Sequence, residues 1–133
     1  MAVVHEFGHA VAFRIPTKDV EAFNAVSWSS DGKRKTSATL SDFVSGYAMS
    51  SRHEDFAESY LAYVMRNEWF RKKASKNPSL KAKYDFFRTK VFTDGSFSGT
   101  DFTVGKLDSA YDMAAVASDM DAFFSHLRGV QKK

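Results

Sequence analysis

The chain has 133 residues, which is the size of one domain with its own hydrophobic core. Hydrophobic residues make up 44% of it and charged residues 26%, so the composition excludes a disordered protein. There is no cysteine, which excludes a disulfide framework and a thiolate metal site. Any metal must therefore be held by histidine, aspartate or glutamate.

The net charge is +3, and the basic residues form three separate clusters: Lys33-Arg34-Lys35, Arg71-Lys72-Lys73 and Lys132-Lys133. We interpret these clusters as solvated loops and helix ends and expect no nucleic-acid partner. No apolar run approaches the roughly 18 residues of a membrane span, and the first ten residues lack the apolar region of a signal peptide. The sequence does not determine the cellular compartment. One option is that the chain is secreted as part of a longer bacterial protein.

Residues 2–14 are predicted to form an amphipathic helix that ends at Ile15-Pro16, with the histidines on a stripe apart from the apolar one. Its expected apolar stripe is Val3, Val4, Phe7 and Val11. A short second helix should follow within residues 16–26, capped by Thr17. The polar stretch that follows, residues 27–42, predicts a long loop or an irregular hairpin that turns at Asp31-Gly32.

Residues 42–51 are expected to be extended and irregular, with Gly46 permitting an unusual backbone angle before Tyr47. From its cap at Ser51 a long helix should run to about residue 73. Asn77-Pro78 opens another helix, and its expected buried face is Leu80, Tyr84, Phe87 and Val91. A last helix is predicted over residues 107–127.

The stretch VVHEFGHAVAF, residues 3–13, has two histidines four residues apart and a glutamate directly after the first. On a helix, His5 and His9 lie one above the other and can direct two imidazoles at one ion. Glu6 is rotated by about 100° from His5, which puts its carboxylate where it can take a proton from an attacking water. Gly8 and Ala10 are small, which is typical of a helix against which a neighbouring segment packs closely. The alternative is that these polar residues form the solvent-exposed face of an ordinary amphipathic helix.

A catalytic zinc site needs a third protein ligand, and the stretch HEDFAESYLAY offers one. Glu54 and Glu58 share a helical face, and two like charges so placed repel unless a cation faces them. We expect one glutamate to bind the metal and the other to accept the N–H of a ligand histidine. The alternatives are two solvated glutamates, or His53 as a competing ligand; an exposed His53 is the simpler interpretation.

HEFGHA followed by SGYAMSSRHEDFAESY resembles the catalytic domain of anthrax lethal factor and related bacterial zinc peptidases, which are zincins of the glutamate-ligand type. The similarity covers residues 3 to about 66. It implies a full set of site residues: His5, His9 and Glu54 as zinc ligands, Glu6 as general base, Glu58 as the carboxylate behind a ligand histidine, and Tyr47 as the group that stabilises the oxyanion.

The expected fold is therefore mainly α, a single zincin-like metallopeptidase domain over residues 1–133 with an active-site helix and a C-terminal helical subdomain. The resemblance also implies a small sheet before the motif helix, whose edge strand pairs with the substrate backbone. The chain leaves no room for that upstream sheet. We expect either a fragment of a larger protein or a shortened relative.

The predicted function is zinc-dependent endopeptidase activity on a peptide or protein substrate. One alternative is a non-catalytic zinc-stabilised binding domain, which would keep the ligands without needing Glu6. Another is a nucleic-acid module built on the basic clusters, but the aromatic residues are spaced as core residues and not as a stacking platform. For Tyr47, the alternative to a role in stabilising the oxyanion is that of an aromatic residue that packs a loop against the core. Cleavage specificity and oligomeric state stay open.

Overall fold

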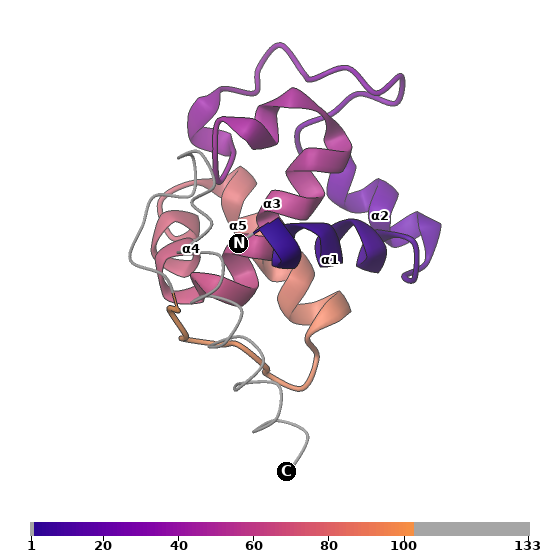
Figure 1. Ribbon diagram of the computed structural model, residues 1–133. Coiled ribbons are helices and arrows are strands. Elements are labelled where there is room, and N and C mark those ends of the chain that lie inside the picture. Colours follow the sequence, from indigo (N-terminus) through magenta and orange to yellow (C-terminus); the bar gives the residue numbers. More distant parts are fainter. Residues whose placement is uncertain (1, 103–133) are drawn as a thin grey trace.

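The computed structural model describes residues 2–102 and is mainly helical over that range, as predicted (Figure 1). The helices are α1 (Ala2–Ala12), α2 (Thr17–Asn24), α3 (Arg52–Met65), α4 (Asn67–Ala74) and α5 (Pro78–Phe86). Three short helical turns accompany them: η1 (Leu40–Asp42), η2 (Tyr47–Ser50) and η3 (Phe87–Val91). The helix predicted over residues 107–127 lies outside the described residues. No helix within residues 2–102 combines the length and the apolar character that crossing a bilayer requires.

α3 forms the centre of the fold, and α1, α2, α4 and α5 all pack against it. Every residue of α3 from Asp55 to Met65 is buried. A helix that is covered on all sides is the core element of its domain. Its first turn is capped as predicted, because the Ser51 hydroxyl accepts a hydrogen bond of 3.1 Å from the backbone N–H of Glu54.

Aromatic rings fill the space between α2, α3 and α5. Phe23 lies 5.0 Å from Phe56 and 5.3 Å from Phe86, measured between ring centroids, in edge-to-face geometry. Such pairs add to the stabilisation that burial of the rings already provides. Further along α3, burial raises the pKa of the Tyr60 and Tyr63 phenols to about 12 each. Both phenols therefore stay neutral at physiological pH.

The buried face of α1 differs from the predicted one. Val4 is fully buried, but Phe7 is 44% exposed, while His5, expected on a separate stripe, is only 4% exposed. Ala10 is also exposed, although its small size suggested a close contact. The histidine side of α1 therefore faces α3, because Gly8 on that side allows the two helices to approach.

The segment before α3 is wound into turns and not extended as predicted, since η1 and η2 occupy much of it. Gly46 has ordinary right-handed angles, φ −62° and ψ −36°, so the prediction of an unusual angle there is wrong. The turn at Asp31-Gly32 is present: Gly32 has φ +85°, and an isolated antiparallel bridge joins Trp28 to Arg34. At α2, Thr17 is the first helical residue and makes no capping hydrogen bond.

The predicted long helix from residue 51 to about 73 is divided at Arg66, whose angles are φ −139° and ψ 50°. The buried side chain of Asn67 stabilises this break between α3 and α4 with hydrogen bonds. Its amide N–H donates to the Tyr63 carbonyl at 3.0 Å, and its oxygen accepts from the Tyr84 hydroxyl at 2.8 Å. α5 then packs back on α4 and begins, as predicted, at Asn77-Pro78 with Pro78 in its first turn; the Asn77 side chain caps it by accepting from the backbone N–H of Leu80.

A buried ion pair joins α5 to α3. Lys83 and Asp55 have side chains that are 0% exposed, and the Lys83 Nζ lies 3.0 Å from Asp55 Oδ2. The ammonium also donates to the carbonyl of Asp42 at 2.8 Å and lies 4.1 Å from the ring centroid of Phe43. The Trp28 indole N–H donates to the same carboxylate at 2.9 Å. The pair thus fixes the α2–α3 connection to the core.

We predict that Lys83→Met lowers the free energy of unfolding by roughly 3–5 kcal/mol, because it leaves the Asp55 charge buried without its cation. Urea denaturation followed by circular dichroism measures the change. Lys81→Met is the matched control: it removes an exposed pair with Asp85 on the same helix and should cost about 0.5 kcal/mol or less. Equal losses in the two variants would contradict the stabilising role of the buried pair.

Candidate metal centre

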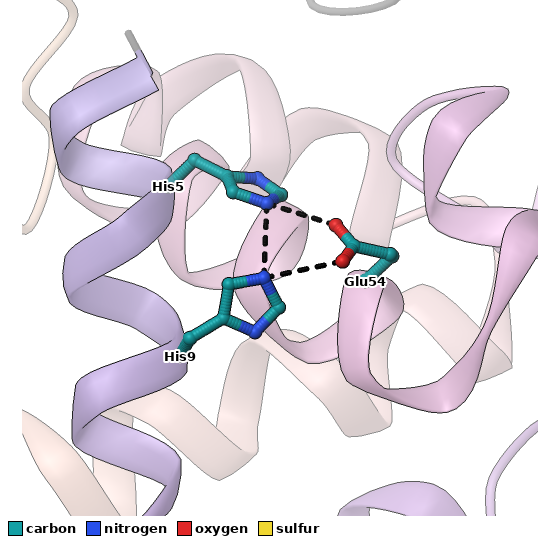
Figure 2. A group of neighbouring side chains, drawn as sticks. All are labelled: His5, His9 and Glu54. Carbon is teal, nitrogen blue, oxygen red and sulfur yellow. Dashed lines mark hydrogen bonds and ion pairs between the residues drawn. The ribbon is translucent and has the colours of Figure 1, made fainter.

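Two imidazoles from α1 and one carboxylate from α3 converge on a common point (Figure 2). The Nε2 atoms of His5 and His9 lie 3.1 Å apart. Glu54 reaches them with both oxygens: Oε2 lies 2.8 Å from His5 Nε2, and Oε1 lies 3.2 Å from His9 Nε2. The structure therefore brings together the three residues predicted as metal ligands.

The close approach of α1 to α3 positions these side chains. A Cβ atom on Gly8 would lie 2.9 Å from the Ala57 Cα and 3.1 Å from the Cβ of Tyr60. Carbon atoms do not approach so closely, so a larger residue at this position would push the helices apart. The i, i+4 spacing of the histidines then places both rings over the first turn of α3, where Glu54 lies.

The donor set fits a zinc ion. His5 donates from Nδ1 to Glu58 Oε2 at 2.8 Å, which leaves a lone pair on Nε2 of the neutral ring. Glu54 Oε2 is buried and lies 2.8 Å from this Nε2 atom, so a cation between the two would take a lone pair from each. Zinc–ligand bonds of about 2.0–2.1 Å in a tetrahedron place the donor atoms about 3.3 Å apart, close to the separations seen here. Two histidines and one glutamate also match the three protein ligands of a catalytic zinc site.

The surrounding charge favours a cation at this point. Burial alone would lower the pKa of His5, but its hydrogen bond to Glu58 and the negative charges of Glu58, Glu54 and Glu6 together raise that pKa above its usual value. The same carboxylates that stabilise an imidazolium would stabilise a metal ion.

Glu58 holds His5 in place from behind. Its side chain is 2% exposed and accepts two hydrogen bonds, from His5 and from the Ser45 hydroxyl at 2.9 Å. Ser45 in turn accepts a hydrogen bond of 3.1 Å from the backbone N–H of Ala48. The geometry is the one expected for the partner of a ligand histidine. The sequence pattern did not identify Ser45, because no spacing rule distinguishes it from other loop serines.

Tyr47 lies at the edge of the cluster on η2. Its ring centroid is 5.8 Å from that of His5, and its side chain is 51% exposed. The negative charge of Glu54, supported by partial burial, raises the pKa of the phenol. The hydroxyl therefore stays protonated at neutral pH and can donate a hydrogen bond towards the site.

Glu6 is exposed and lies beside the cluster, not within it. Its negative charge is among the smaller causes that raise the pKa values of His5 and Tyr47, so Glu6 lies within electrostatic range of the cluster. It also lines a shallow hollow of about 380 Å³ with Val3 and Phe7 on the outer face of α1. A residue so placed can exchange protons with a molecule that approaches from solvent.

Among the described residues, His53 stays out of the cluster. It is exposed at the start of α3, whereas the next residue, Glu54, turns towards α1.

No protein-family model, curated protein or solved structure matches this chain. The likeness to zincins of the glutamate-ligand type therefore depends on the motif residues and on the geometry described above.

We predict that the chelator-treated protein binds one Zn²⁺ tightly and that His9→Ala abolishes this binding, since two ligands remain. Isothermal titration calorimetry measures the stoichiometry and affinity. His53→Ala is the matched control and should bind Zn²⁺ like the parent protein, because His53 is exposed and contributes no donor atom. An unchanged stoichiometry in His9→Ala would rule out this metal site.

We predict that Glu58→Gln weakens zinc binding about 10- to 100-fold while leaving the stoichiometry at one ion, because His5 loses a charged hydrogen-bond partner. Competition with a chromogenic chelator measures the affinity. Glu68→Gln, at a partly exposed glutamate of α4, should leave the affinity unchanged. An equal effect of both variants would mean that Glu58 acts only through the net charge of the protein.

Proposed function

We propose that this chain is a zinc-dependent peptidase domain that hydrolyses peptide bonds. The observation that supports this most strongly is the convergence of His5, His9 and Glu54, with Glu58 holding the first histidine from behind. This arrangement joins two segments about 50 residues apart in sequence. A chance HExxH sequence on an ordinary helix would not bring a third donor and its supporting carboxylate with it.

When bound, a zinc ion in such a site acts as a Lewis acid and lowers the pKa of a water molecule towards about 7. Glu6 would take a proton from the attacking water and deliver it to the leaving amine. Tyr47 would donate a hydrogen bond to the oxyanion that develops on the scissile carbonyl, an interaction that strengthens in the transition state. Both residues are accessible to a substrate, in contrast to the buried His5 and Glu58.

A non-catalytic zinc-stabilised binding domain is the second candidate function. One observation favours it: within residues 2–102 the extended pairing is limited to the bridge between Trp28 and Arg34. That part of the chain therefore offers no sheet edge to pair with a substrate backbone, as zincins do. A substrate would instead have to be held by side chains around the metal site.

The basic clusters do not favour a nucleic-acid function. Arg71 and Lys72 on α4 both lie near Glu68, at 2.6 Å and 4.0 Å, so part of this charge is compensated. Lys33-Arg34-Lys35 lies on the separate connection between α2 and α3. Nucleic-acid binding needs a continuous basic surface, and the two clusters within residues 2–102 belong to different elements.

We predict that Glu6→Gln lowers the rate of peptide hydrolysis by about 10²- to 10⁴-fold and leaves zinc affinity unchanged, because the amide cannot accept the proton. Cleavage of a denatured protein, followed by mass spectrometry, measures the rate. Glu68→Gln again serves as the control and should cleave like the parent. A parent protein that binds zinc but cuts no peptide, with Glu6→Gln indistinguishable from it, would instead support the binding domain.

A further inference from the structure

A hollow of about 500 Å³ opens beside the candidate metal centre. It lies between the end of α1, one side of α2 and the first turns of α3. Its walls include Ala12, Val20 and Phe56, and its volume lies within the range of about 300–1,000 Å³ that is typical of ligand pockets. The proposed function gives this hollow no role.

The hollow adjoins the metal centre through His9. The same imidazole that offers Nε2 to the cluster also lines the hollow, and its side chain is 27% exposed. On α3, His53 lines the hollow and is followed directly by Glu54 of the cluster. A chain bound with a carbonyl at the cluster would therefore extend a neighbouring side chain into this space.

The chemistry of the hollow favours an apolar side chain. Ala12, Val20 and Phe56 provide an apolar wall of aliphatic and aromatic carbon. The charged residues that line it have opposite signs, with Arg52 against Glu21, so no single charge is attracted into it. Burial of methylene groups against this wall is then the dominant favourable contribution to binding.

A second hollow of about 370 Å³ continues from the first along α2. The two share Glu21, Asn24 and Arg52, and the second extends to Trp28 and Ser29. Together they form a groove that runs away from His9. A groove with this extent fits several residues of an extended peptide better than it fits one small molecule.

We infer that the first hollow is the specificity subsite of this enzyme and takes a large apolar side chain, such as leucine, methionine or phenylalanine, adjacent to the bond that is cut. This inference rests on the proposed peptidase function. Val20 is its specificity-determining residue, because it lines the hollow from α2, whereas the residues of the metal cluster belong to α1 and α3.

The test uses the zinc-loaded full chain and a denatured protein substrate, with the residues flanking each cut identified by mass spectrometry. On one side of the cut, large apolar residues should be enriched at least about tenfold over alanine and glycine, since each added methylene in an apolar pocket contributes about a tenfold preference or more. Val20→Trp fills the hollow and should abolish the enrichment. Val20→Ala enlarges it and should shift the preference towards tryptophan, which keeps the test valid if Val20→Trp does not fold.

The matched control is Ala22→Trp, at an exposed position of α2 that does not line the hollow, and it should keep the parent preference.

A second measurement needs neither metal nor activity. N-acetyl-phenylalanine amide, titrated into the chelator-treated protein, should shift the NMR signals of Val20 and Ala12 in a saturable way. N-acetyl-aspartate amide should not shift them.

The outcomes separate the two proposals. Cleavage without an apolar preference, or with a preference that survives in Val20→Trp, would overturn the subsite and leave the peptidase function intact. A complete lack of cleavage would contradict the peptidase function, and the amide titration would then decide whether the hollow takes an apolar side chain. If N-acetyl-phenylalanine amide shifted the Ala12 signal equally in Val20→Trp and in the parent, the assignment of the hollow as an apolar side-chain pocket would be overturned as well.

Discussion

The candidate metal centre depends on the distance between α1 and α3. Gly8 lies against Ala57 and Tyr60 with no room for a side chain, so the axes of the two helices come as near as backbone contact allows. An HExxH helix by itself provides two donors and no more. The third donor, Glu54, lies within 2.8 Å and 3.2 Å of the two rings because α3 packs this close to α1.

The first two turns of α3 carry three carboxylates, and each has a different set of partners. Glu54 faces the two histidines, Asp55 is neutralised by Lys83 and receives the Trp28 indole N–H, and Glu58 binds His5 and Ser45. Two of these carboxylates are fully buried, which is unfavourable unless every acceptor is satisfied. The α2–α3 connection and α5 provide the partners. The same contacts that stabilise the fold therefore also position the side chains of the candidate metal centre.

Several features that depend on near neighbours in sequence were predictable, although the cap at Thr17 and the unusual angle at Gly46 were not found. The helix of the motif, the Ser51 cap and the Asn77-Pro78 helix start all follow from local rules, and the structure has them. Features that depend on distant partners were missed. The burial of His5 and exposure of Phe7 require knowing which face of α1 meets α3, and the break at Arg66 depends on Asn67 bonding to Tyr84 and Gly99. Ser45 and Lys83 acquire their roles only once α3 and α5 are in place. The candidate site was thus predictable in its residues, but not in the contacts that position them.

The division between buried and exposed residues bears on which function the chain performs. His5, Glu58 and Ser45 are buried and would be needed by any zinc-stabilised domain, catalytic or not. Glu6 and Tyr47 are exposed, and exposed side chains contribute little to stability. The packing of the domain therefore gives no reason for an exposed carboxylate on α1 and a neutral phenol beside His5. Peptide hydrolysis does give one, because it needs a group that moves a proton and a group that stabilises an oxyanion there. The two residues that the fold does not need are the ones that the proposed peptide hydrolysis would need, and this supports the proposal of a peptidase over that of a binding domain.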